Sequence, residues 1–333
     1  MGRKMRVVIN GFGRIGRLTL RRLLLMSEIE IVAINDLADG AMLGHLFKFD
    51  SVHGSLSTKI EVVDNELYVG SRKIKMLSIS DPSQLPWAEL SVDIVIESTG
   101  RFVTKESAFK HIESGAKKVI ISAPGKGDIK TVVIGVNDDS LAKSDIIVSN
   151  ASCTTNCLAP MIKVLDNAFG VEKGFISTVH AFTADQNLQD SPHRDWRRAR
   201  AASVSIIPTS TGAASAVGKV LPHLNGKLDG IALRVPIPDG SLTDLTVVLH
   251  QKTTTEELND HMKKASKNLM KGVMQYSDES LVSIDIIGNS HSCIFDSKLT
   301  AVNGNLAKVI GWYDNEFGYA CRTAELARML FNL

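Results

Sequence analysis

Short runs rich in valine and isoleucine, separated by helix-like stretches, set the strongest limit on how the first half of this chain can fold. The runs are nearly continuous in apolar residues, which is typical of parallel strands buried on both faces. They cover 6–10, 30–36, 92–98, 117–122 and 145–150, and helical patterns occupy 12–25 and 104–115. Strands that alternate with helices predict βαβ units and a doubly wound parallel sheet.

After Pro160 the pattern of apolar residues changes. The apolar runs lie closer together and alternate more with polar residues, as in antiparallel sheets with one solvated face. Helical segments are predicted near 211–220, 255–271 and 316–331. The second half therefore predicts an α+β domain on a mostly antiparallel sheet. A chain of 333 residues also exceeds the usual size of one hydrophobic core, which favours two domains.

The segment "INGFGRIGR" directly follows the first apolar run and opens the first helix. Gly11, Gly13 and Gly16 match G-x-G-x-x-G, the phosphate-binding turn of dinucleotide-binding sheets. Gly11 would permit a tight turn, Gly13 a close approach to a pyrophosphate, and Gly16 close packing of helix and sheet. Asp36 ends the second strand, 20 residues after Gly16, where a carboxylate reaches a ribose diol and repels the extra phosphate of NADP. The motif predicts a Rossmann-type domain that binds NAD, and the alternative is a glycine-rich turn without a ligand.

The first helix is predicted to be amphipathic, with one face buried against the sheet. That face carries Phe12, Ile15, Gly16, Thr19 and Leu23, and the opposite face carries Arg14, Arg17 and Arg21. Gly16 thus falls where a missing side chain matters, and the arginines fall away from the buried face.

The segment "SNASCTTNCLAP" places Cys153 near the junction of a strand and a helix, with Ser152 as a candidate cap. A thiolate at a helix N-terminus is stabilised by the helix dipole, which predicts a lowered pKa and a nucleophilic cysteine. Cys157 lies one turn later, at about 5–6 Å between Cβ atoms, whereas a relaxed disulfide needs about 3.8 Å. No further metal ligands lie nearby at suitable spacing, so no metal site is expected. Cys157, Cys293 and Cys321 fit small buried apolar residues.

A thiol nucleophile needs a base, and anionic substrates need cations. His180 ends the apolar run "FISTVHAF", where active-site groups are often placed, and is the candidate base. The basic segment 193–202 is either a solvated loop or subunit contact, or an anion site. The segment 208–214, "PTSTGAA", places hydroxyls and a glycine at a helix start, which favours phosphate. Arg234 lies in an apolar strand and must pair with something if it is buried. These residues therefore predict two phosphate-sized sites around the thiol.

With "INGFGRIGR", "SNASCTTNCLAP", "PTSTGAA" and "WYDNEFGY" in order, the sequence resembles phosphorylating glyceraldehyde-3-phosphate dehydrogenase from end to end. The resemblance implies that Cys153 attacks the aldehyde of glyceraldehyde 3-phosphate and forms a hemithioacetal. It implies that His180 takes the hydroxyl proton while hydride passes to the nicotinamide. Inorganic phosphate then attacks the thioester and releases 1,3-bisphosphoglycerate. A thioester keeps the oxidation energy in a form that phosphate can capture.

The resemblance also implies the residues that bind each ligand. The cofactor positions are Asn10, Gly11, Phe12, Gly13, Arg14, Ile15, Gly16, Asp36, Leu37, Thr99, Ser122, Asn315 and Tyr319. The substrate-phosphate positions are Thr183, Asp185 and Arg234, with Asp185 acting indirectly by orienting its neighbours. The inorganic-phosphate positions are Ser152, Thr154, Arg198, Thr211 and Gly212. Two departures from the family pattern, Ser80 and Ser191, leave an adenine contact in question and some use of NADP open.

The expected domains are 1–150 with 315–333 for the dinucleotide, and 151–314 for catalysis. By resemblance the chain forms a homotetramer. The first residues lack the pattern of a signal peptide, no apolar run reaches the about 18 residues of a membrane span, and the cysteines are sparse, so a cytoplasmic protein is expected. The net charge of +2 gives no reason to expect a primary role with nucleic acid. Erythrose-4-phosphate dehydrogenase, a nucleotide-binding protein without catalysis and a cysteine hydrolase are the rival interpretations.

Overall fold

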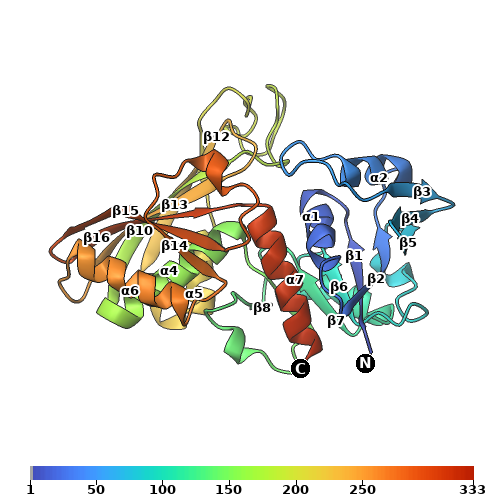
Figure 1. Cartoon of the computed structure of the whole chain (residues 1–333), viewed down its shortest axis with the longest axis horizontal. Helices are drawn as coiled ribbons and strands as arrows, with labels where there is room; N and C mark the ends of the chain where they lie inside the picture. The colour runs from blue at the N-terminus through green and yellow to red at the C-terminus, as the bar shows by residue number, and fades with distance from the viewer. Residues whose placement is uncertain (1–2) are drawn as a thin grey trace. The chain divides into compact units, whose positions relative to one another are not determined.

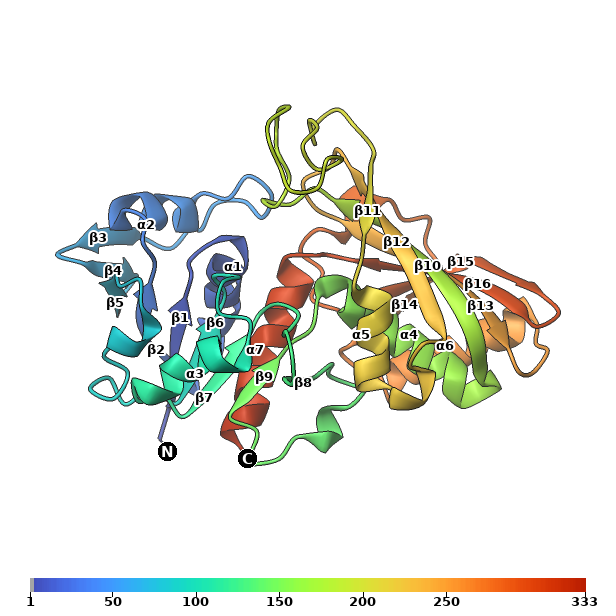
Figure 2. The same cartoon turned by 180° about the vertical axis from the view of Figure 1, so that it is seen from behind.

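The computed structural model describes residues 3–333. Contacts divide the chain into two compact units, shown in Figures 1 and 2, and each is described here by itself. Unit 1 comprises the chain up to Val132, with Ser140–Ala151 and Ala320–Leu333, and unit 2 comprises Val133–Asp139 and Ser152–Tyr319. The assignment of 1–150 with 315–333 to dinucleotide binding and of 151–314 to catalysis remains a prediction. None of the helices in residues 3–333 has the length and apolar character needed to cross a bilayer.

Unit 1 is built on a sheet whose strands follow the order β3-β4-β5-β2-β1-β6-β7-β9-β8 (Figure 1). The strands are β1 (Met5–Asn10), β2 (Ile29–Asn35), β3 (Ile60–Val63), β4 (Glu66–Val69), β5 (Arg72–Leu77), β6 (Ile94–Glu97), β7 (Lys118–Ile121), β8 (Lys130–Thr131) and β9 (Ile147–Ser149). The predicted apolar runs form β1, β2, β6, β7 and β9, which join in parallel pairs, so the doubly wound sheet is confirmed. The antiparallel edge of β3, β4 and β5 was not expected.

The order of the strands places a ligand site at the carboxyl ends of the central strands of this sheet. β1 lies between β2 and β6, so the chain winds away from β1 in two directions. At such a switch point the loops beyond the carboxyl ends of the strands leave a crevice. All four residues of β6 are buried, which explains its unbroken apolar character up to Glu97. The helices of unit 1 are α1 (Arg14–Leu23), α2 (Gly40–Lys48), α3 (Lys105–Glu113) and most of α7 (Phe317–Phe331).

Helix α1 is more deeply buried than its periodicity predicted. Gly16, Thr19 and Leu23 are buried as expected, but Arg17 is only 8% exposed. The prediction that Arg17 lies away from the buried face is therefore wrong. Its long side chain folds back along the helix, and Nη1 donates to the carbonyl oxygen of Phe12 at 2.8 Å. A basic residue can be buried in this way because the carbonyl replaces part of its hydration.

Unit 2 is built on a sheet of order β11-β12-β10-β13-β16-β15-β14. The strands are β10 (Val171–Ala181), β11 (Ile207–Ser210), β12 (Leu228–Val235), β13 (Ser241–Leu249), β14 (Met274–Ser277), β15 (Cys293–Asn303) and β16 (Leu306–Tyr313). Only β10–β12 and β14–β15 pair in parallel, so the mostly antiparallel sheet is confirmed. Helices α4 (Cys153–Phe169), α5 (Ala213–Val220) and α6 (Thr255–Lys267) pack together against this sheet (Figure 2).

Candidate active site

A cavity of about 290 Å³ opens at the switch point of unit 1. Its walls include six of the expected cofactor positions: Asn10, Gly11, Gly13, Asp36, Leu37 and Thr99. Ser80, one of the two departures from the family pattern, also lines the cavity. Phe12, Arg14, Ile15, Gly16 and Ser122 do not line it. Phe12 packs against Phe47 instead, and Arg14 pairs with Asp50 at 2.7 Å.

The three glycines differ in what surrounds them. Gly11 has φ +93°, a left-handed conformation that favours glycine at the turn after β1. A Cβ atom at Gly16 would lie 2.2 Å from the carbonyl oxygen of Gly11, so only glycine lets the helix approach the turn this closely. A Cβ atom at Gly13 would meet nothing within 4 Å, which leaves open space beside the backbone. These surroundings fit the tight turn, the close packing and the open approach that the motif predicts.

The carboxylate of Asp36 is held at the rim of the cavity by backbone donors. Oδ2 accepts a hydrogen bond from the Phe12 N–H at 2.6 Å, and Oδ1 accepts one from the Ala38 N–H at 3.0 Å. Each oxygen keeps a further lone pair. Asp36 can therefore accept hydrogen bonds from ribose hydroxyl groups while it keeps its bonds to Phe12 and Ala38.

Cys153 and His180 meet in unit 2, although 27 residues separate them. Cys153 is the first residue of α4, and the Ser152 hydroxyl caps this helix by accepting from the Thr155 N–H at 3.0 Å. His180 lies near the end of β10, with Nε2 at 3.4 Å from Sγ of Cys153. Its Nδ1 lies 2.7 Å from the carbonyl oxygen of Ala181. Donation from Nδ1 to this carbonyl is the tautomer that leaves Nε2 free to accept the thiol proton.

The pKa values of this pair describe a neutral thiol beside a neutral imidazole. Burial raises the pKa of Cys153 to about 11, although the charge of Arg234 and hydrogen bonds from Thr154 oppose the rise. The expected lowering of this pKa is therefore wrong, because desolvation of the thiolate outweighs the nearby positive charges. Burial, followed by the charge of Arg234, lowers the pKa of His180 to about 3. Near neutral pH the imidazole is unprotonated and the sulfur carries its proton.

Arg234 lies beside this pair because β12 runs parallel to β10 and places it opposite His180. Its Nη1 donates to the Ala181 carbonyl at 3.0 Å and also lies 2.8 Å from Nδ1 of His180. Because a guanidinium only donates, this second contact is a hydrogen bond only in the other tautomer, with the proton on Nε2, and the tautomer that frees Nε2 keeps only the bond from Nδ1 to the Ala181 carbonyl. Its Nε is buried and has no hydrogen-bond partner among the described residues. An unsatisfied buried guanidinium nitrogen is costly, so the site has capacity for an anion.

A second arginine is held nearby by an acidic partner. Arg198 forms an ion pair with Asp185, and its Nε donates to the Thr209 hydroxyl at 2.9 Å. The orienting role expected of Asp185 stays a prediction, and this ion pair is the contact through which it would act. The charge of Arg198 also contributes to the lowered pKa of His180, so the two clusters influence each other. The structure thus gathers Cys153, His180 and both arginines into one region of unit 2.

The remaining expected phosphate positions occupy turns and helix starts. Gly212 is the N-cap of α5, and the Thr211 hydroxyl accepts from the Ala213 N–H at 3.2 Å. The Thr183 N–H donates to the Gln186 side chain at 3.3 Å. The hydroxyl of Thr154 is buried against the Tyr313 hydroxyl at 2.9 Å. Thr154 can offer this hydroxyl to phosphate only by exchanging its partner.

Sequence reasoning missed two hydroxyl residues that support the site. The Tyr313 hydroxyl bridges Thr154 and Thr178, and its ring packs edge-on against His180 with centroids 5.9 Å apart. The Ser241 hydroxyl accepts from the Ala181 N–H at 3.0 Å and donates to Oδ1 of Asn315 at 2.6 Å. Ser241 and Tyr313 are paired residues of β13 and β16, so only the strand register brings them together. Tyr319, another expected cofactor position, is buried.

The fold and these two sites define a class. A glycine turn at the switch point of a parallel sheet binds a dinucleotide, and a cysteine–histidine pair forms covalent intermediates with carbonyl substrates. Together they define a dinucleotide-dependent oxidoreductase that uses a cysteine.

Comparison with known proteins identifies the family within that class. Residues 5–105 match the family model described as glyceraldehyde 3-phosphate dehydrogenase, NAD binding domain, and residues 152–315 match its C-terminal domain. The chain is 52% identical to glyceraldehyde-3-phosphate dehydrogenase 2 of Bacillus subtilis over 327 residues, which cover 98% of this chain and 96% of the relative. It is 53% identical to the Mycobacterium avium glyceraldehyde-3-phosphate dehydrogenase over 333 residues, covering 98% of each. The chain belongs to the glyceraldehyde 3-phosphate dehydrogenase family, and NAD is its cofactor.

Proposed function

We propose that this chain oxidises D-glyceraldehyde 3-phosphate with NAD and inorganic phosphate, giving 1,3-bisphosphoglycerate in glycolysis and gluconeogenesis. The observation that carries the proposal is the 3.4 Å contact between Cys153 Sγ and His180 Nε2, beside Arg234 with its buried Nε. The aldehyde, NAD and phosphate are consumed, and the acyl phosphate, NADH and one proton are formed. Membership of the family supports the substrate.

The proposed chemistry begins with the thiol. Sγ of Cys153 attacks the aldehyde carbon as Nε2 of His180 accepts the thiol proton, and the resulting alkoxide takes up that proton to give a hemithioacetal. His180 then removes the hydroxyl proton while the C–H bond breaks and a thioester remains on Cys153. Bound NAD supplies the acceptor for the hydride. An oxygen of inorganic phosphate attacks the thioester carbon, and the sulfur leaves and regains its proton.

The electrostatics around His180 support its proposed role as a base. At neutral pH it is unprotonated, because its pKa is lowered to about 3. A substrate phosphate on Arg234 would offset the guanidinium charge, which is one cause of this lowering. The pKa of His180 then moves upward when substrate binds, so the imidazole becomes a stronger base at the stage that needs it.

We assign the two phosphate groups to the two arginines. Thr183 and Arg234 would bind the substrate phosphate, with Asp185 acting through Arg198. Ser152, Thr154, Arg198, Thr211 and Gly212 would bind inorganic phosphate. Arg198 is held in place by Asp185 and Thr209, and Gly212 lies at the start of α5, so a bidentate cation and a helix N-terminus support this assignment.

The residues of unit 1 fit NAD. Space beside Gly13 allows a pyrophosphate to approach the backbone, and Asp36 can accept the ribose hydroxyls. By resemblance, Asn315 of unit 2 would hold the nicotinamide carboxamide, and within unit 2 its Oδ1 accepts from the Ser241 hydroxyl. Asp36 and Leu37 favour NAD, and we propose that any use of NADP is minor.

Dependence on phosphate tests this function. We expect NADH formation from glyceraldehyde 3-phosphate to require added phosphate or arsenate, because only these anions release the thioester rapidly. Equal rates without either anion would favour a hydrolytic enzyme such as erythrose-4-phosphate dehydrogenase. Failure to bind NAD at all would favour a cysteine hydrolase. Turnover by a Cys153→Ser variant at the parent rate would contradict the proposed role of Cys153 as the nucleophile.

Assembly and location are further parts of the proposal. We propose a homotetramer in the cytoplasm. Exposed apolar residues on the sheet of unit 2 and on its arginine-rich loop support burial against other copies of the chain. Examples are Phe175 at 70% exposed, Ile231 at 50% and Trp196 at 89%. Sedimentation at micromolar concentration would measure the number of subunits.

A further inference from the structure

A buried carboxylate lies directly behind the cofactor cavity of unit 1. Glu97 is the last residue of β6 and is 1% exposed. Its Oε1 accepts hydrogen bonds from the N–H of Thr99, at 2.8 Å, and from the Thr99 hydroxyl. Its Oε2 accepts from Nδ2 of Asn10 at 2.6 Å and lies 3.1 Å from Nε2 of His111. Asn10 and Thr99 both line the cavity, whereas Glu97 does not.

The buried His111 has its tautomer fixed by Trp87. The indole Nε1 of Trp87 lies 3.0 Å from Nδ1 of His111 and can only donate. Nδ1 must therefore accept, and the proton of the neutral ring lies on Nε2, facing Glu97. Oε2 of Glu97 thus receives two donors and Oε1 receives two more. A buried carboxylate with four donors is satisfied in its ionised form.

The same network continues to a second residue of the cavity wall. Oδ1 of Asn10 accepts from Nδ2 of Asn35 at 2.7 Å. Nδ2 of Asn35 also donates to the Ile79 carbonyl at 2.9 Å, and Oδ1 of Asn35 accepts from the Ile79 N–H at 2.9 Å. Asn35 and Ile79 also line the cavity. The Ile79 backbone therefore fixes the Asn35 amide, and Glu97 and Asn35 together fix the Asn10 amide between them.

We propose that Glu97, oriented by His111 and Trp87, is a positioning residue that fixes the part of the NAD-binding wall formed by Asn10 and Thr99. This inference rests on the proposed function, because it takes this cavity to be the one that holds NAD. Glu97 acts through its neighbours: it holds the Asn10 amide in one orientation and both polar groups of Thr99 in place before the cofactor arrives. Such preorganisation strengthens binding by reducing the ordering that the ligand must impose.

The Glu97→Gln substitution removes the carboxylate charge and one of its two acceptor oxygens, and it keeps the volume of the side chain nearly constant. In Glu97→Gln one acceptor oxygen becomes an NH2 group, which must face either Thr99 or the pair of Asn10 and His111. Facing Thr99, it meets a backbone N–H that cannot change its role. If the new NH2 group faces Asn10 and His111, it opposes the NH2 group of Asn10. Reversing the Asn10 amide would then turn the NH2 group of Asn10 toward Nδ2 of Asn35, which is also a donor. No arrangement satisfies all donors, so the cavity wall must shift.

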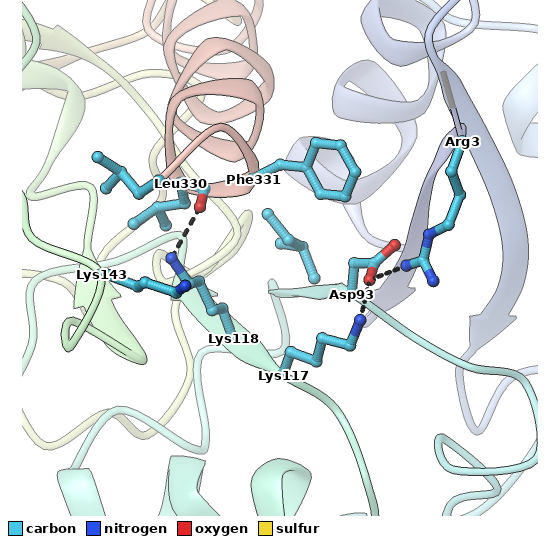
Figure 3. A pocket seen from close by; sticks show the side chains of 9 residues that line it. Arg3, Asp93, Lys117, Lys118, Lys143, Leu330 and Phe331 are labelled. Atoms are coloured by element: carbon cyan, nitrogen blue, oxygen red, sulfur yellow. Dashed lines mark hydrogen bonds and ion pairs between the residues drawn. The ribbon is translucent and has the colours of Figure 1, made fainter. Parts of the chain in front are cut away.

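The experiment compares this variant with His111→Gln, His111→Phe and a control. Glutamine at 111 can donate to Glu97 and accept from Trp87, whereas phenylalanine can do neither. The control is Asp93→Asn, just before the amino end of the same strand β6. Asp93 is also buried, but it pairs with Arg3 and Lys117 (Figure 3), at the other end of β6 from Glu97. The Asp93→Asn variant therefore removes a buried carboxylate charge and leaves the residues that line the cavity unchanged.

We expect Glu97→Gln to raise the Kd and KM for NAD by about tenfold to hundredfold. His111→Phe should raise them less, and His111→Gln least. The KM for the aldehyde and the alkylation rate of Cys153 without cofactor should stay at the parent values. Asp93→Asn should lower the melting temperature and leave the Kd for NAD unchanged.

Two results would separate this inference from the proposed function. If Glu97→Gln and Asp93→Asn lower stability alike and neither changes the Kd for NAD, Glu97 is only structural and the inference fails. If Asn10→Ala and Thr99→Ala also leave the Kd unchanged, the cavity itself is not the NAD site and that part of the proposed function fails. Equal loss of NAD affinity in His111→Gln and His111→Phe would overturn the role given to His111.

Discussion

The glycine cavity of unit 1 and the thiol site of unit 2 differ in how completely their polar groups are satisfied. Asp36, Glu97 and Asn10 each have hydrogen-bond partners within unit 1. At the thiol site the buried Nε of Arg234 lacks a partner among the described residues, and burial moves the pKa values of Cys153 and His180 apart, to about 11 and about 3. The polar groups of the cavity in unit 1 are therefore fixed in place before a ligand binds. The thiol site in unit 2 keeps an unpaired guanidinium N–H and an unprotonated imidazole that can interact with a ligand.

The largest expected effect is a loss of kcat in variants of the thiol site of unit 2, with NAD binding to the cavity of unit 1 unchanged. Cys153→Ser should lower kcat by about 10⁴-fold or more, because a hydroxyl beside a weakly basic imidazole is a much poorer nucleophile. His180→Asn should lower kcat by about 10²- to 10⁴-fold through loss of the base. Steady-state rates and NAD titrations measure both. A large loss of NAD affinity in either variant would mean that the two sites are not separable in this way.

Two alanine substitutions separate shape from ligand contact within the glycine turn. In Gly16→Ala the new Cβ would lie 2.2 Å from the Gly11 carbonyl oxygen, so helix α1 must move, at a cost of about 1–3 kcal/mol in stability. Gly13 has φ −70° and free space around a Cβ, so Gly13→Ala should leave the melting temperature unchanged. It should still raise the KM for NAD by about tenfold, because the methyl group occupies the approach of the pyrophosphate. Unchanged NAD binding in Gly13→Ala would contradict the proposed role of this turn.

The pH dependence of alkylation tests the charge state of the thiol site. With the pKa of Cys153 near 11, the thiolate fraction rises with pH throughout the neutral range, so modification by uncharged iodoacetamide should accelerate steadily up to that value. Arg234→Met removes a charge that lowers this pKa, so the profile should move to higher pH. A rate that is already constant between about pH 6 and 9 would show a preformed thiolate. A shift to lower pH in the variant would reverse the role given to Arg234.

The smallest expected effect concerns cofactor choice. Asp36→Asn keeps one acceptor oxygen for the Phe12 N–H but removes the negative charge at the cavity rim. We expect the ratio of kcat/KM for NADP to that for NAD to rise by about threefold to tenfold. Initial rates with each cofactor measure it. No change in this ratio would assign the selectivity to other residues, such as those around Ser191.

The glycine turn could be read from the sequence because its spacing encodes its geometry. Gly11, Gly13 and Gly16 are local in the chain, and their φ angles and clearances follow from that spacing. The same holds for the five parallel strands, whose burial on both faces requires unbroken apolar runs. The antiparallel edge of β3 to β5 lacked such runs, because its strands are short and half exposed.

The thiol site could be predicted only in part, because its contacts depend on strand register. Arg234 lies beside His180 because β12 pairs with β10, and Ser241 lies beside Tyr313 because β13 pairs with β16. Nothing in the local sequence encodes these pairings. The pKa of Cys153 was mispredicted for a related reason. The helix start was visible in the sequence, but the burial that outweighs its dipole arises from tertiary packing.

Trapping the acyl group on the protein tests the central claim most directly. The parent chain is mixed with NAD and glyceraldehyde 3-phosphate in the absence of phosphate and arsenate, and the products are quenched in acid and analysed by peptide mass spectrometry. We predict a burst of about one NADH per chain and a 3-phosphoglyceryl group on Cys153, which disappears when phosphate is added. Continuous NADH formation with no acyl group on Cys153, or an acyl group on another residue, would contradict the account.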